Sequence, residues 1–161
     1  MTTELPHERV PVGEARTRVI ASVRLLDTES VALKDLAGRT VGLAVTAPHN
    51  LPAHANSAMD GYAVVAGSAG PWTISAHILA GDNPAPLIAG TAAAIATGGV
   101  LPVGADAVVP IERVEVVDEL VTATEPIASG DFVRHVGADV QAGDVVLHPG
   151  TRLTPLATSA V

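Results

Sequence analysis

The alternation of apolar and polar positions predicts one helix near the start of the chain. Apolar residues recur at helical spacing from Val12 to Leu26, and charged residues occupy the other faces of this segment. Pro11 suits the first turn of a helix, and Asp27-Thr28 is expected to end it.

The remainder of the chain predicts a mostly β architecture. Short apolar runs alternate with Gly, Pro and Asn, which is typical of strands joined by turns. A hairpin turn is expected at residues 117–120, and a short helix near the end, with Thr154 as cap and Pro155 in the first turn. The expected strands are residues 40–45, 63–66, 72–79, 92–97, 107–112, 114–117, 120–124 and 145–147.

Composition narrows the class of protein. With 48% hydrophobic and 16% charged residues in a chain of 161, intrinsic disorder is disfavoured. Residues 83–105 carry no charge, but their prolines and glycines would break a membrane-spanning helix. No membrane association is therefore expected.

Charge and cysteine content exclude further classes. The net charge of −8, the absence of a basic run and the 2% aromatic content argue against nucleic-acid binding. The absence of cysteine removes disulfides and thiolate metal sites, and it agrees with the cytoplasmic location that we expect. The six histidines are scattered, so a histidine metal site is not expected.

The richest candidate stretch runs from Asn56 to Ala63. It places an amide, a hydroxyl and a carboxylate on one short loop, where Gly61 permits a close backbone approach beside Asp60. Such a loop suits a polar ligand, with Asp60 holding a divalent cation or a proton. Taken alone, the stretch is also explained by an ordinary turn in which Asn56 and Asp60 cap backbone groups.

Two further stretches carry candidate chemistry. The free N–H groups of Thr97-Gly98-Gly99 are candidates to cradle an oxyanion, although the lysine of a nucleotide P-loop is absent. The guanidinium of Arg134 is a candidate to bind phosphate or carboxylate through two N–H groups, and Asp139 is a candidate partner for a metal or a hydroxyl. A plain turn and a surface salt bridge are the competing interpretations.

The order of these segments along one chain resembles the molybdopterin molybdenumtransferase family, which includes the cofactor-synthesising domain of gephyrin. The resemblance covers the chain from about Val12 to Pro155, and the run Asn56-Ser57-Ala58-Met59-Asp60-Gly61-Tyr62 is its most specific part. The other matching segments are 51–52, 97–98, 101–102, 104–109, 133–134, 137 and 139, 142–144 and 150–155.

The resemblance implies a reaction and a set of site residues. Enzymes of this family take adenylated molybdopterin and molybdate and release AMP, with Mg²⁺ implied as cofactor. The catalytic positions are Asp60, Thr97 and Asp139, of which Asp60 and Asp139 would hold Mg²⁺. The substrate-binding positions are Asn56, Ser57, Met59, Gly98, Glu112 and Arg134.

The resemblance also implies a bifurcated, mainly β fold. Residues 1–44 and 140–161 would form an elongated linker lobe, and residues 45–139 an inserted β-barrel-like lobe. The family's α/β domain would lie beyond Val161, so that a homodimer or a partner chain would complete the active site. On this view the chain alone is inactive.

Some positions depart from the family pattern. Ala94 lies in a strand that often carries a basic residue, His135 and Val136 replace a more basic run, and Ala138 replaces a residue that is commonly acidic or polar. The first two changes reduce the positive charge that a phosphorylated substrate would meet. They motivate an alternative function, a non-catalytic module that binds molybdopterin or docks on another cofactor-synthesis protein.

Overall fold

A computed structural model of the chain describes residues 10–159, and the mainly β fold that we predicted is confirmed. Short strands dominate, and the helices are few and brief. In chain order the elements are α1 (Val12–Ser22), the 3-10 helix η1 (Leu33–Asp35), β1 (Val45–Thr46), β2 (Asn56–Ser57), β3 (Gly61–Val64), β4 (Trp72–Ile78), β5 (Thr91–Ile95), β6 (Ala107–Pro110), the 3-10 helix η2 (Ile111–Arg113), β7 (Val114–Val117), β8 (Leu120–Ala123), β9 (Val133–Arg134), β10 (Val145–Leu147) and α2 (Pro155–Thr158).

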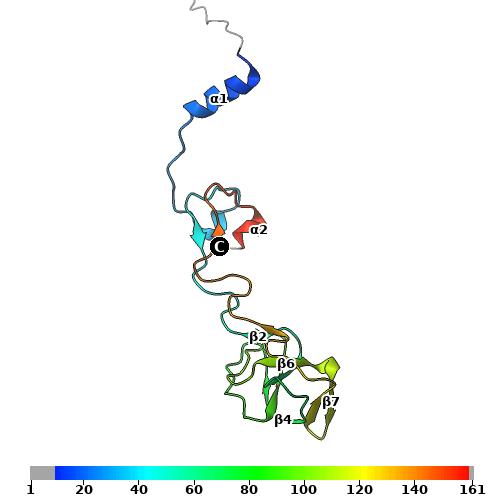
Figure 1. Ribbon diagram of the computed structural model, residues 1–161. Helices are drawn as coiled ribbons and strands as arrows, with labels where there is room; N and C mark the ends of the chain where they lie inside the picture. Colours follow the sequence, from blue (N-terminus) through cyan, green and yellow to red (C-terminus); the bar gives the residue numbers. More distant parts are fainter. Residues whose placement is uncertain (1–9, 160–161) are drawn as a thin grey trace, which may run out of the picture.

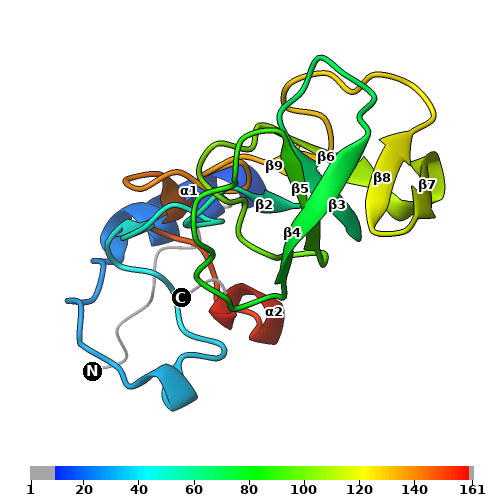
Figure 2. The same cartoon turned by 90° about the horizontal axis from the view of Figure 1, so that it is seen from below.

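A curled six-stranded sheet forms the body that carries the candidate site (Figure 2). Its strand order is β6-β3-β5-β4-β8-β7. Every neighbouring pair is antiparallel except β4 and β5, which run parallel and are joined by a crossover through residues 79–90. The crossover must pass over one face of the sheet, because parallel neighbours cannot be joined by a tight hairpin.

The two faces of this sheet bury separate groups of side chains. One face gathers Trp72 with small aliphatic residues such as Val64 and Val121. The other face, under the crossover, gathers Ile78, Ile95 and neighbouring small residues. The division follows from the alternation of side chains along each strand.

A narrow neck of two antiparallel chain segments leads away from the sheet (Figure 1). It contains the β2–β9 ladder and the bridge between Leu51 and Val140. Beyond the neck, β1 pairs with β10, and a small core of Val41, Leu147 and Leu153 forms. The lobe limits expected at 44/45 and 139/140 stay a prediction. Val45 lies in β1, which pairs with β10 near the end of the chain.

Several predicted elements differ in extent. The first helix ends at Ser22 and not near Asp27, because Val23 is already extended with φ −88° and ψ 132°. No side chain of α1 is buried, so packing does not stabilise further turns. The expected strand at 40–45 is reduced to a bridge between Thr40 and Arg152, followed by β1.

Other local predictions are confirmed. Residues 117–120 form the hairpin turn between β7 and β8. Thr154 caps α2 by accepting a hydrogen bond from the Ala157 N–H at 3.1 Å, and Pro155 begins the helix. None of the helices in residues 10–159 has the length and hydropathy needed to cross a membrane.

Candidate functional site

The central contact of the candidate site joins Asp60, just before β3, to Thr97, just after β5. Asp60 Oδ1 accepts hydrogen bonds from the Thr97 backbone N–H at 2.7 Å and from the Thr97 hydroxyl at 2.8 Å. The Thr97 backbone bond first, and its hydroxyl bond second, hold the pKa of the exposed Asp60 carboxyl below its ordinary value. Asp60 is therefore ionised at neutral pH.

The loop before Asp60 is fixed by buried polar contacts. Ser57 is fully buried, and its hydroxyl donates to the Met59 carbonyl at 2.5 Å. Gly61 is required next to Asp60, because a Cβ there would lie 2.2 Å from the Val109 carbonyl oxygen. The predicted turn is present: Ser57 stabilises it and Asp60 accepts a backbone N–H, but Asn56 Oδ1 caps no group among the described residues. Ligand binding by this loop stays a prediction.

The oxyanion cradle expected at Thr97-Gly98-Gly99 does not form. The Gly98 N–H donates to the Ser57 carbonyl at 2.8 Å, and the Gly99 N–H donates to the Ala96 carbonyl at 2.9 Å. The Thr97 N–H is bound to Asp60. All three amides are engaged within the protein, so this segment positions Asp60 and leaves no N–H group for an anion.

A second polar group lies at the neck. Arg134 and Asp139 form an ion pair with an N–O distance of 2.6 Å, and both side chains are about half exposed. Arg134 is paired in register with Asn56, whose Oδ1 is buried and has no hydrogen-bond partner among the described residues. The surface salt bridge that we considered for Arg134 is therefore present, and its partner is the other candidate residue, Asp139.

A hollow of about 260 Å³ opens beside Asp60, and we call it the Asp60 hollow. Asp60 is the predicted site residue that lines it directly, and Thr97 is bound to that carboxylate. Glu112 is exposed on η2, directly after Ile111, which does line the hollow. The other lining residues include Tyr62, His77, Leu79 and Ala94, none of which the sequence analysis had singled out as a site residue.

The other predicted residues do not line the Asp60 hollow. Met59 is partly exposed on the loop. Asn56, Ser57, Gly98, Arg134 and Asp139 lie outside the lining, although β2 connects them to it, because Asn56 pairs with Arg134 and Ser57 bonds to Gly98. The structure thus groups Asp60 with Thr97, and Arg134 with Asp139, one pair on either side of β2.

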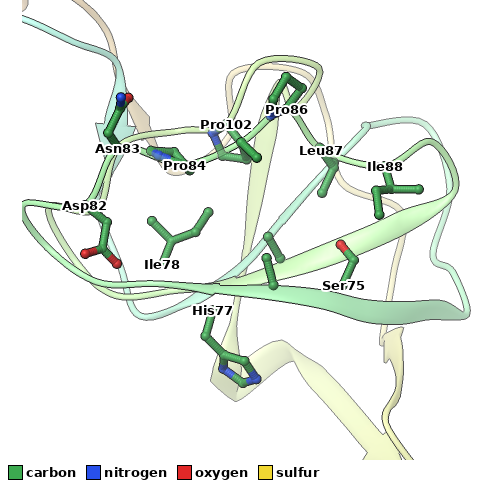
Figure 3. Close-up of a pocket in the computed structure, with 13 residues that line it drawn as sticks. Ser75, His77, Ile78, Asp82, Asn83, Pro84, Pro86, Leu87, Ile88 and Pro102 are labelled. Carbon is green, nitrogen blue, oxygen red and sulfur yellow. The ribbon is translucent and has the colours of Figure 1, made fainter.

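A larger cavity of about 370 Å³ lies under the crossover (Figure 3). Proline and aliphatic side chains, among them Pro84, Pro102 and Leu87, form most of its wall. None of the predicted site residues lines it. We therefore place the candidate site at the smaller Asp60 hollow.

The donor set suits Mg²⁺ only in part. Within residues 10–159, no three His, Cys, Asp or Glu side chains gather into a metal site. Asp139 is engaged by Arg134, whereas Asp60 uses only Oδ1 in its bonds with Thr97. A magnesium ion keeps several waters and takes one or two carboxylates together with substrate phosphates, and the free oxygen of Asp60 fits that requirement.

The architecture places the chain among proteins of molybdopterin biosynthesis. A crystal structure of a molybdopterin biosynthesis moeA protein from Pyrococcus horikoshii OT3 superposes with a TM-score of 0.88 at 29% identity, covering 95% of this chain and 43% of that one. A family model described as MoeA N-terminal region (domain I and II) matches residues 10–161, so the chain belongs to this family.

Curated relatives agree with this assignment. A molybdopterin molybdenumtransferase of Synechococcus elongatus is 35% identical over 82% of this chain, and one of Bacillus subtilis is 35% identical over 93%. The chain spans 35% and 38% of the length of these two relatives. The part of these relatives that the chain matches is the N-terminal region, in agreement with the family model.

Proposed function

We propose that this chain supplies one side of the site at which molybdate is inserted into adenylated molybdopterin with release of AMP, in the cytoplasm. The observation that supports this role is the Asp60–Thr97 contact at the edge of the Asp60 hollow. It presents a fixed, ionised carboxylate on an exposed loop, in a chain that belongs to a molybdopterin-handling family.

The lowered pKa of Asp60 bears on its role. A general base works best when its pKa lies near the working pH, and the Thr97 hydrogen bonds move this carboxyl in the opposite direction. Asp60 is therefore suited to bind a cation and poorly suited to accept a proton. With one oxygen held by Thr97, the second would contribute to holding Mg²⁺, which supplies positive charge against the substrate phosphates.

Asp139 and Arg134 take a supporting role in this proposal. Their ion pair fixes both side chains beside β9, and Arg134 offers its remaining N–H groups to an anionic part of the substrate. Asp139 would join Asp60 at the metal only after giving up Arg134. We therefore assign the metal to Asp60 before Asp139.

The remainder of the site is proposed to come from an α/β domain, in a homodimer or in a partner chain. The chain spans only about a third of its curated relatives. Helix α1 also lacks any buried side chain, with Val12 87% and Val23, just after it, 68% exposed. A short helix without tertiary contacts is marginal in water, so α1 needs a surface to pack against.

The alternative is a non-catalytic module that binds molybdopterin or docks on another cofactor-synthesis protein. The engagement of Arg134 by Asp139 favours it, because it removes positive charge from substrate binding. This function predicts that affinity capture from cells recovers a cofactor-synthesis protein, and that molybdopterin binds to the isolated chain. Recovery of no such protein, together with no measurable pterin binding, would rule the module out.

The test of the main proposal is a pair of isosteric substitutions. Asp60→Asn keeps an oxygen for both Thr97 hydrogen bonds but removes the charge. Asp82→Asn is the matched control, because Asp82 is also an exposed carboxylate that accepts a backbone N–H, from Leu79 at 2.8 Å, and it lines the crossover cavity. In an assembly completed by the α/β domain, we expect AMP release to fall by about 10²–10³ in the Asp60 variant, because charge stabilisation by Mg²⁺ is lost, and to stay unchanged in the control.

A further inference from the structure

Three strands bring a row of side chains to the wall of the Asp60 hollow. In the register of the sheet, Tyr62 of β3 pairs with Ala94 of β5, and Ala94 pairs with His77 of β4. Directly paired residues project from the same face of a sheet. The small side chain of Ala94 therefore leaves open space between the phenol of Tyr62 and the imidazole of His77, and all three residues line the hollow.

His77 borders both the crossover cavity and the Asp60 hollow, but its imidazole points to the face of the hollow (Figure 3). Figure 3 shows Ile78 and Ser75 directed toward the crossover, while the imidazole of His77 lies on the other side of β4. A register shift between Ile74 and Ala76 sets this alternation. His77 is exposed, so its ring is available to a ligand in the Asp60 hollow.

The charges around the Asp60 hollow bear on the role of His77. No Lys or Arg of the described chain lines the hollow, and Asp60 contributes a negative charge. A phosphorylated substrate would be repelled there unless another group offset its charge. Arg134 is bound to Asp139 and lies outside the lining, so His77 is the side chain of the hollow that can carry positive charge and donate N–H hydrogen bonds.

We propose that His77 is a substrate-binding residue, whose imidazole donates a hydrogen bond to a phosphate oxygen of the substrate held beside Asp60. This inference rests on the proposed function, since it assigns the anion-binding group of the same site. In this arrangement Asp60 would bind the Mg²⁺ ion and His77 would bind a phosphate group of the substrate.

The test uses inorganic pyrophosphate with Mg²⁺ as a probe for the substrate phosphates, and the chain as it stands. We expect the His77 imidazole resonances to shift on titration, together with the amides of Asp60 and Thr97. His77→Ala should weaken binding about tenfold, and His77→Lys should restore it to within about threefold, because a cationic donor returns. His49→Ala is the control, since His49 is also exposed and lines neither the hollow nor the cavity.

The outcomes separate this inference from the function on which it rests. Shifts at Asp60 and Thr97 without a shift at His77, and unchanged affinity in His77→Ala, would overturn the role of His77 and leave the proposed function standing. Failure of His77→Lys to restore binding would overturn the charge argument. No shift at any of the three residues would contradict both the inference and the proposed site.

Discussion

At the scale of single residues, the ionisation of Asp60 affects both the stability of the fold and the candidate site. The folded-state pKa of its carboxyl lies below the unfolded value, so the folded protein binds fewer protons at this group. The resulting stabilisation is fully present above the unfolded pKa. It is lost as the pH falls through the folded pKa.

This sign gives a measurable pH dependence. We expect Asp60→Asn to lower the urea midpoint at pH 7, where the wild-type carboxylate is ionised. The gap to the wild type should begin to narrow below about pH 4, where the unfolded carboxyl takes up its proton, and should close as the pH falls through the lower folded-state pKa. Equilibrium denaturation in urea at pH 7 and below pH 4 measures the difference in midpoint between the two proteins. A difference of constant size would contradict the proposed effect of the Thr97 hydrogen bonds.

Residue identity could be predicted from sequence, but residue contacts could not. The loop around Asp60 stands out because it combines a carboxylate with a permissive glycine. Its partner Thr97 is 37 positions away, and no local pattern links the two. His77 was overlooked because its place beside Ala94 depends on a parallel register and a local irregularity in β4, neither of which the spacing of apolar residues encodes.

At the scale of elements, the β7–β8 hairpin is where local sequence and fold can be tested most simply. Its two turn residues, Asp118 and Glu119, have φ of 50° and 63°, in the left-handed region. Glycine is favoured in that region and β-branched residues are strongly disfavoured.

We therefore expect opposite effects from two substitutions at Glu119. Glu119→Gly should raise the free energy of unfolding by up to about 1 kcal/mol, and Glu119→Val should lower it by about 1–2 kcal/mol. Glu115→Val is the matched control on the adjoining strand, where valine fits an extended backbone and should be neutral or stabilising. Thermal unfolding followed through Trp72, buried in the same sheet, reports all three. Equal effects of valine at both positions would contradict the turn.

The elements themselves follow from sequence to different degrees. Strands with several alternating residues, such as β4 and β7, were predicted within a residue or two. The two-residue strands β2 and β9 were missed, because they have no period of their own and are defined by pairing with each other across the neck. The end of α1 was placed too late, because the apolar spacing continues past Ser22 although the backbone is already extended at Val23.

At the scale of the whole molecule, the sheet and the neck carry two polar groups, one on either side of β2. Asp60 and Thr97 lie on one side, and Arg134 and Asp139 on the other. Apolar side chains on α1 remain exposed. These exposed side chains fit the proposal that further protein completes the active site.

The most direct test is AMP release from adenylated molybdopterin, with molybdate and Mg²⁺ present. The chain alone and an assembly completed by the α/β domain are compared, each with Asp60 intact and with Asp60→Ala. The account predicts no release by the chain alone, release by the completed assembly, and loss of that release in the variant. Release by the chain alone that depends on Asp60, or a completed Asp60→Ala assembly that stays active, would contradict it.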